Sequence, residues 1–192
     1  MCGIIGAVAS RDITPVLLEG LQRLEYRGYD SAGLAVVHEK KIERVRRLGK
    51  VKGLQGALKD RDVSGHIGIA HTRWATHGTP SEGNAHPHLS GGKVAVVHNG
   101  IIENYLELKR ELQTQGHAFE TETDTEIIAH LVEREMRDDG LENAARRAFA
   151  FLRGMFAVVL VGAGDPDKIV AARKGPPMIV GIGEDEFFVA SD

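Results

Sequence analysis

The sequence has one cysteine, few aromatic residues and no long apolar run, and each shortage excludes a class of protein. With Cys2 as the only thiol, an internal disulfide is excluded, and we expect a reducing, cytoplasmic setting. No run approaches the ~18 apolar residues that a transmembrane helix needs, so we expect no membrane partner. The formal charge is -3, from 24 basic and 27 acidic residues, so no broad positive field recruits nucleic acid.

The rest of the composition is that of one globular domain. A chain of 192 residues, 42% of them hydrophobic, is long enough for one buried core and short for two. Helical spacing of apolar residues predicts helices over 13–24, 50–58, 105–112, 127–136 and 141–152. Strand-like runs cover 3–9, 32–38, 41–48, 66–74, 93–98, 155–161, 169–173, 178–182 and 187–190. Because the strands are grouped and the last four are joined by short turns, the pattern favours an α+β fold with antiparallel hairpins.

Four local patterns predict how these elements begin, end and face solvent. Asp12 is a candidate N-cap for the first helix, and Thr123-x-x-Glu126 has the form of a capping box. Asn99-Gly100 ends an apolar run; alone it is typical of a hairpin turn, but the residues after it resemble a helix entry. The basic residues 44–47 alternate with an apolar residue, which predicts the exposed face of a strand.

Cys2 stands at a position where a thiol has a special use. Removal of Met1 would make it the N-terminal residue, carrying both a thiol and an α-amine whose pKa is ~7.7–8.0. A nucleophile with its own base is what N-terminal-nucleophile hydrolases need. The alternative is that Cys2 packs as a small apolar residue in the first strand. Position alone does not separate the two interpretations.

Polar segments in a fixed order carry a resemblance to a known family. Behind Met-Cys-Gly-Ile, the sequence contains Tyr-Arg-Gly-Tyr-Asp-Ser-Ala-Gly (26–33), His-Thr-Arg-Trp-Ala-Thr-His-Gly (71–78), Asn-Ala-His-Pro-His (84–88), His-Asn-Gly-Ile-Ile-Glu-Asn (98–104) and Glu-Thr-Asp-Thr-Glu (122–126). From Cys2 to Asp192 it resembles the glutamine amidotransferase domain of the glucosamine-6-phosphate synthase family, also called glutamine–fructose-6-phosphate transaminases. Other class II amidotransferases share the Cys start, a Tyr-Arg-Gly block and an Asn-Gly, but resemble the remaining segments less.

The resemblance implies a role for each matching residue. Cys2 is the nucleophile, and the Asn99 amide with the Gly100 backbone N–H forms the oxyanion hole. Arg73 binds the α-carboxylate of glutamine, a bidentate task suited to a guanidinium, and Asp124 binds the α-ammonium group. The same resemblance places Arg27, Gly28, Trp74, Thr76 and His77 around the glutamine pocket.

Each of these residues also has a plainer interpretation. A lone Arg73 at a strand end is usually a solvated charge, and Asp124 in a first helical turn suits the helix dipole. Trp74 is either a core residue or part of a mobile lid. The capping and binding roles of the 123–126 segment are compatible.

The histidines raise the question of a metal site. His71, His77, His86, His88 and His98, with Cys2, offer zinc-ligand atoms, but their spacing matches no compact zinc motif. We expect the rings of His86 and His88 to point in different directions. The prediction is therefore no metal and no cofactor, with histidines that are structural or line the pocket.

Together these observations predict a glutamine-hydrolysing domain covering residues 1–192. The resemblance implies a four-layer αββα sandwich of the N-terminal-nucleophile hydrolase type. It also implies a parent enzyme, a homo-oligomer, whose sugar-isomerase domains would follow Asp192 and aminate fructose 6-phosphate with the ammonia released. Two alternatives remain: an amidotransferase with a different acceptor, and a non-enzymatic glutamine sensor.

Overall fold

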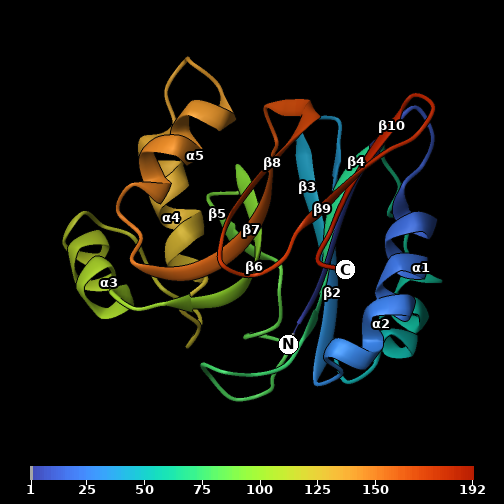
Figure 1. Ribbon diagram of the computed structural model, residues 1–192, viewed down its shortest axis with the longest axis horizontal. Coiled ribbons are helices and arrows are strands. Elements are labelled where there is room, and N and C mark those ends of the chain that lie inside the picture. Colours follow the sequence, from blue (N-terminus) through green and yellow to red (C-terminus); the bar gives the residue numbers. More distant parts are fainter. Residues whose placement is uncertain (1) are drawn as a thin grey trace.

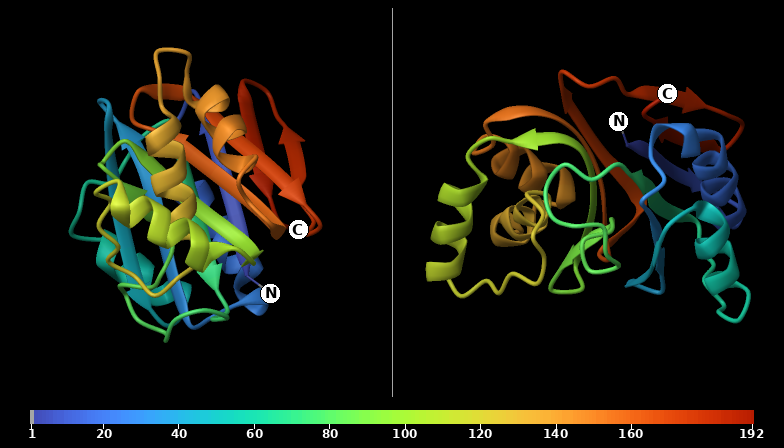
Figure 2. Two further views of the ribbon diagram at one scale, coloured as in Figure 1. Left: turned by 90° about the vertical axis from the view of Figure 1, so that its left-hand side faces the viewer. Right: turned by 90° about the horizontal axis from the view of Figure 1, so that it is seen from below.

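Two antiparallel sheets face each other and are enclosed by helices on both outer sides (Figure 1). The computed structural model describes residues 2–192; Met1, whose removal the sequence analysis expects, lies outside the described residues. Figure 2 shows the molecule from two other directions, and its right-hand view again has helices on the two outer sides of the sheets. The predicted α+β sandwich is confirmed.

The larger sheet carries the N-terminal strand near its middle. Its strands run in the order β3-β2-β4-β1-β10-β9, and α1 (Thr14–Leu24) and α2 (Val51–Leu58) cover its outer face. The strand bounds are β1 Gly3–Ala9, β2 Ser31–His38, β3 Lys41–Leu48, β4 Ile67–Arg73, β9 Ile179–Ile182 and β10 Glu186–Ala190. Beyond β10, Ser191 ties the two ends together: its N–H donates to the Ile4 carbonyl, and the Ile4 N–H donates to its hydroxyl at 3.0 Å.

The smaller sheet has the order β5-β6-β7-β8. Helices α4 and α5 pack on its outer face, with α3 beside α4. A short 3₁₀ turn, Glu25–Arg27, follows α1. The bounds are β5 His88–Ser90, β6 Val94–Ile102, β7 Gly154–Gly162, β8 Asp165–Lys174, α3 Tyr105–Thr114, α4 Glu126–Glu135 and α5 Leu141–Phe149. No helix within residues 2–192 is long and apolar enough to span a bilayer.

Alternating apolar side chains on both sheets form the central core layer. Ile4 and Ile69 from the larger sheet pack with Val97 and Val159 from the smaller one, all without solvent exposure. Gly6 lets the sheets approach closely, because a Cβ there would lie 3.3 Å from a Val159 methyl carbon. The two outer layers have separate apolar clusters beneath α1 and α2 and beneath α3, α4 and α5.

Strand β6 differs most from its predicted course. The sequence predicted a strand over 93–98 and a helix entry at Ile101, but β6 continues to Ile102, and α3 begins only at Tyr105. The reason is non-local, because residues 99–102 pair with β7, with Asn99 opposite Ala157. Asn99-Gly100 is thus inside a strand, and the hairpin-turn interpretation is wrong.

Both predicted helix caps are wrong in detail. Helix α4 starts at Glu126 itself, and no side chain caps its N-terminus. The Glu126 carboxylate instead accepts the backbone N–H groups of Glu120 and Thr121, both at 2.9 Å. Asp12 precedes the cap position of α1; its carboxylate accepts the N–H groups of Thr14 and Gly65.

The basic residues of β3 are not a solvated face, contrary to the prediction. Arg46 is half-buried and donates to the carbonyls of Gly83 and Ala85, while Arg44 donates to that of Pro87. These two arginines therefore fix the backbone of the segment before β5, a strand that the sequence analysis did not predict. The hairpins β7–β8 and β9–β10 form as predicted, but the chain crosses between sheets from β8 to β9.

The contact between the two sheets gives a first prediction. Ile69→Ala should lower the free energy of unfolding by about 2–5 kcal/mol, because Ile69 is fully buried between the sheets and its removal leaves a cavity. Ile179→Ala is the matched control: the side chain is 54% exposed on edge strand β9, and its loss should change stability by no more than ~0.5 kcal/mol. Denaturant unfolding of both variants measures the difference, and equal losses would contradict this account of the core.

Candidate functional site

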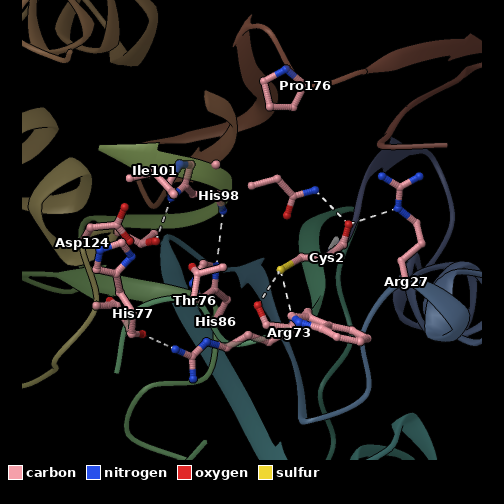
Figure 3. Close-up of a pocket in the computed structure, with 15 residues that line it drawn as sticks. Cys2, Arg27, Arg73, Thr76, His77, His86, His98, Ile101, Asp124 and Pro176 are labelled. Carbon is pink, nitrogen blue, oxygen red and sulfur yellow. Dashed lines mark hydrogen bonds between the residues drawn. The ribbon is translucent and has the colours of Figure 1, made fainter. Parts of the chain in front are cut away.

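A cavity of about 270 Å³ opens beside the start of β1 and the ends of β4 and β6 (Figure 3). It gathers nearly all the residues that the sequence analysis selected. Those on its wall are Cys2, Arg27, Arg73, Trp74, Thr76, His77, Asn99, Gly100 and Asp124. Gly28 is the exception; it lies behind the wall, where a Cβ would come within 2.7 Å of the Arg73 carbonyl and 2.9 Å of the Trp74 nitrogen.

Cys2 lies directly before β1 and is held through both its thiol and its carbonyl. The Trp74 N–H donates to Sγ at 3.2 Å, and the thiol donates to the Trp74 carbonyl at 3.5 Å. Arg27 Nε and Asn99 Nδ2 donate to the Cys2 carbonyl at 3.2 and 2.9 Å. Burial raises the pKa of the thiol, with the Trp74 contact opposing the shift. The thiol therefore needs a base to become a nucleophile.

His71 fixes the orientation of the Asn99 amide. His71 Nε2 lies 3.1 Å from Asn99 Oδ1 and 3.2 Å from the His98 carbonyl; both are acceptors, so Nε2 carries the proton. Because Oδ1 is bonded to this ring, Nδ2 is the amide atom that faces Cys2. Burial lowers the pKa of His71 to about 3, so the ring is neutral.

Gly100 follows Asn99 in a conformation that suits glycine, with φ at +131°. A Cβ there would lie 2.1 Å from the Met155 carbonyl oxygen of the neighbouring strand β7. A side chain at this position would thus push β6 away from β7 and displace the backbone beside Asn99.

Arg73 and Asp124 place opposite charges on the cavity wall. The Arg73 guanidinium is 3% exposed and donates to the carbonyls of His77, Gly78 and Thr79. The Asp124 carboxylate is equally buried and accepts the Ile102 N–H at 2.8 Å. Within residues 2–192 neither has an oppositely charged side chain within 4.0 Å. Buried charges without a partner are costly, so this wall suits a ligand carrying both signs.

The structure also shows lining residues that the sequence analysis did not select as site residues. They are His86, His98, Ile101, Thr123, Thr125 and Pro176. His98 follows Val97 in β6 and bonds Thr125 through Nδ1 at 2.9 Å. Pro176 comes from the crossover between the sheets, and no local pattern marks it as near Cys2.

The histidines behind the cavity form one uncharged cluster. The rings of His71 and His86 stack with centroids 4.1 Å apart, and those of His86 and His88 meet edge to face at 4.7 Å. The last two rings are therefore in contact, while their planes differ by 68°. Burial lowers the pKa of His86, His88 and His98. In residues 2–192 the group that brings possible metal ligands together lies elsewhere, at His117, His130 and Glu133.

The segment after Arg73 is tied to the segment that carries Asp124. Glu122 accepts hydrogen bonds from the Thr79 N–H and from Asn84 Nδ2, at 3.2 and 2.8 Å. Asn84 Oδ1 in turn accepts the Glu122 N–H at 3.0 Å. Asp30, which the sequence analysis left outside the site, accepts the Ala75 N–H.

Two stacked sheets are enclosed by helices, and a thiol directly before β1 lies inside the cavity. These features are those of the N-terminal-nucleophile amidotransferase class. The glutamine phosphoribosylpyrophosphate amidotransferase of B. subtilis superposes with a TM-score of 0.85 at 26% identity, over 99% of this chain and 42% of that one. A profile of the glutamine amidotransferase domain matches residues 71–192. The chain therefore belongs to the glutamine amidotransferase domain family.

The resemblance of the sequence to glutamine–fructose-6-phosphate transaminases is confirmed as well. Glutamine–fructose-6-phosphate aminotransferases (isomerizing) of Pseudomonas putida and Escherichia coli K12 are 55% and 56% identical to this chain over 194 aligned residues. In both, the match covers 100% of this chain and 32% of the relative, so the chain spans about a third of their length.

The close approach at Gly28 gives a second prediction. Gly28→Ala should displace the Arg73–Trp74 backbone and shift the fluorescence of Trp74, which is the only tryptophan. Gly56→Ala is the control: it lies in α2 with no atom within 4 Å of its added Cβ, and should leave the spectrum unchanged. Identical emission maxima for wild type and Gly28→Ala would contradict the packing described here.

Proposed function

We propose that this domain hydrolyses L-glutamine to glutamate and ammonia through a thioester on Cys2. The observation that carries the proposal is one cavity with a thiol, an oriented amide donor and two unpaired buried charges of opposite sign. An amino acid supplies the complementary carboxylate and ammonium groups to Arg73 and Asp124, and its side-chain amide then extends toward Cys2. A site for a simple amide would need neither charge.

The reaction begins with a proton transfer at the N-terminus. Once Met1 is removed, the α-amine of Cys2 accepts the thiol proton, and the sulfur attacks the side-chain carbonyl carbon of glutamine. Burial of the thiol makes this base necessary, because it disfavours the free thiolate. General-base assistance of this kind contributes about 10²–10⁴ in rate.

The tetrahedral intermediate places a negative charge on the former carbonyl oxygen. Asn99 Nδ2 and the Gly100 N–H donate to it, and losing one such donor typically costs about 10²–10³ in rate. When the carbon–nitrogen bond breaks, the protonated amine returns its proton to the departing nitrogen, which leaves as ammonia. Water then attacks the γ-glutamyl thioester, releasing glutamate and restoring the thiol.

Roles for the other residues on or behind the wall follow from their positions. Arg27 holds the Cys2 carbonyl, and Gly28 leaves room for the Arg73 backbone behind the pocket. We propose that Thr76 and His77 contact bound glutamine. Trp74 is half-exposed beside the thiol and forms part of the lid.

We further propose that residues 1–192 are the amidotransferase domain of an enzyme that makes glucosamine 6-phosphate. The names of the relatives, and the share of their length that this chain spans, support this. In the parent enzyme, a homo-oligomer, the ammonia would aminate fructose 6-phosphate on sugar-isomerase domains of the same chain. The reaction requires a reduced Cys2, which suits the cytoplasm. The chain alone would make glutamate and free ammonia.

An intact-mass measurement tests the nucleophile and its substrate together. After incubation with the glutamine analogue 6-diazo-5-oxo-norleucine, the chain should have lost the mass of Met1 and gained one covalent adduct at Cys2. Excess glutamine should prevent the adduct, whereas excess asparagine should not. A processed chain that stays unmodified would overturn the hydrolase proposal in favour of a glutamine sensor.

The bond from His71 to Asn99 gives a prediction for the rate. His71→Leu removes the donor to Asn99 Oδ1 and should lower kcat about 10- to 100-fold, because the amide is free to turn its oxygen toward the oxyanion. KM should change little, since Arg73 and Asp124 still hold the amino acid. His71→Gln retains an N–H donor and should recover much of the loss. Glutaminase kinetics check this; equal kcat values for the two variants, with unchanged melting temperatures, would contradict the positioning role.

A further inference from the structure

Two histidines and a glutamate form a cluster away from the cavity that holds Cys2. His130 and Glu133 are three residues apart on α4, so they share one face of the helix, and His117 lies on the segment between α3 and α4. One nitrogen of each ring and one Glu133 oxygen all lie within 4.8 Å of one another. They border a cavity of about 450 Å³ that shares no lining residue with the glutamine pocket.

Ser90 determines which nitrogen of His130 is free. Its hydroxyl has one hydrogen, which it donates to the Glu133 carboxylate. Ser90 Oγ also lies 2.7 Å from His130 Nδ1. Because the hydroxyl hydrogen is already donated to Glu133, His130 Nδ1 must carry the proton of this second hydrogen bond. The other ring nitrogen, Nε2, is buried and has no hydrogen-bond partner within residues 2–192. A metal-binding histidine is commonly held in this way, with its second nitrogen donating to an outer residue.

The free nitrogen of His130 faces a negative charge. Glu126 Oε1 lies 3.5 Å from Nε2, and both side chains are at most 9% exposed. A positive charge between or beside these two atoms would offset the charge of the carboxylate. Glu126 therefore supplies a negative charge beside this ring nitrogen, which favours a cation bound there.

The surroundings leave space and exchangeable charge at Glu133. Gly91 allows the carboxylate to approach, because a Cβ there would lie 2.1 Å from Glu133 Oε1. The same oxygen is 3.3 Å from Lys93 Nζ, the ammonium of a side chain that is 61% exposed. Since Lys93 can swing into solvent, its contact with Glu133 is one that a metal ion can replace.

We propose that His117, His130 and Glu133 bind one zinc-class divalent cation, with Ser90 orienting two of the ligands and Glu126 as the neighbouring counter-charge. Two imidazoles and one carboxylate suit zinc, whereas magnesium and calcium prefer oxygen ligands alone. The ion would join α4 to the segment that leads to Thr123 and Asp124, and so stiffen one wall of the glutamine pocket. The proposal does not depend on the proposed hydrolase activity.

Calorimetric titration with Zn²⁺ tests the site. The chain should carry Cys2→Ala, because a thiol is itself a zinc ligand, and should first be stripped with a chelator. We expect one ion per chain, a melting temperature about 3–6 °C higher at tenfold excess over Kd, and a tetrahedral Co²⁺ absorption spectrum. His117→Asn and Glu133→Gln should each weaken binding at least about tenfold, and Ser90→Ala about 10- to 100-fold.

Two further variants separate a built site from adventitious binding. Lys93→Ala removes the competing ammonium and should tighten binding. His38→Asn changes an exposed histidine at the end of β2 and should have no effect. The proposal is overturned if no ion binds with unit stoichiometry, or if the double variant His117→Asn, Glu133→Gln binds as the parent does. His130 and Glu126 would then form a simple imidazolium–carboxylate pair.

Discussion

The hydrogen bond from the Asn99 amide to the Cys2 carbonyl joins the two sheets at the point where chemistry is expected. Cys2 precedes β1 in one sheet and Asn99 lies in β6 of the other, so the geometry of the site depends on how the sheets stack. The packed layer of Ile4, Ile69 and Val159 sets that stacking, because close-packed side chains permit little sliding. The core between the sheets therefore also positions the site.

The polar groups of the site divide into neutral and charged sets with different tasks. The buried histidines are uncharged, so they orient amides and hydroxyls without adding a field of their own. Arg73 and Asp124, the basic and acidic residues of the wall, lie in a poorly solvated place and are held by backbone groups. Such fixed charges and dipoles need little reorganisation when a ligand arrives, which is the usual source of electrostatic catalysis.

The sequence was most informative where patterns are local, and least where a residue's environment comes from distant strands. Periodicity located the helices to within a few residues, and the polar segments named most of the cavity wall. Asn99-Gly100 has the form of a turn, and only pairing with β7 makes it a strand. Likewise, the sequence around Arg44 and Arg46 shows only basic residues on a strand. Their role as hydrogen-bond donors depends on the carbonyls of residues 83–87, which are distant in the sequence. Pro176 joins the site only through the crossover between the sheets, which no local pattern encodes.

The pairing of β1 with β10 gives this domain an order of events during synthesis. Ile4 and Ser191 are 187 residues apart, so the hydrogen bonds between them, and the pairing of β1 with β10, cannot form until the chain has reached residue 191. At about 5–20 residues per second, ~190 residues take roughly 10–40 s. Throughout that interval β1 lacks one of its two neighbouring strands. The backbone around Cys2, directly before β1, therefore lacks its β10 partner for a time whose length is set by the position of β10 in the sequence.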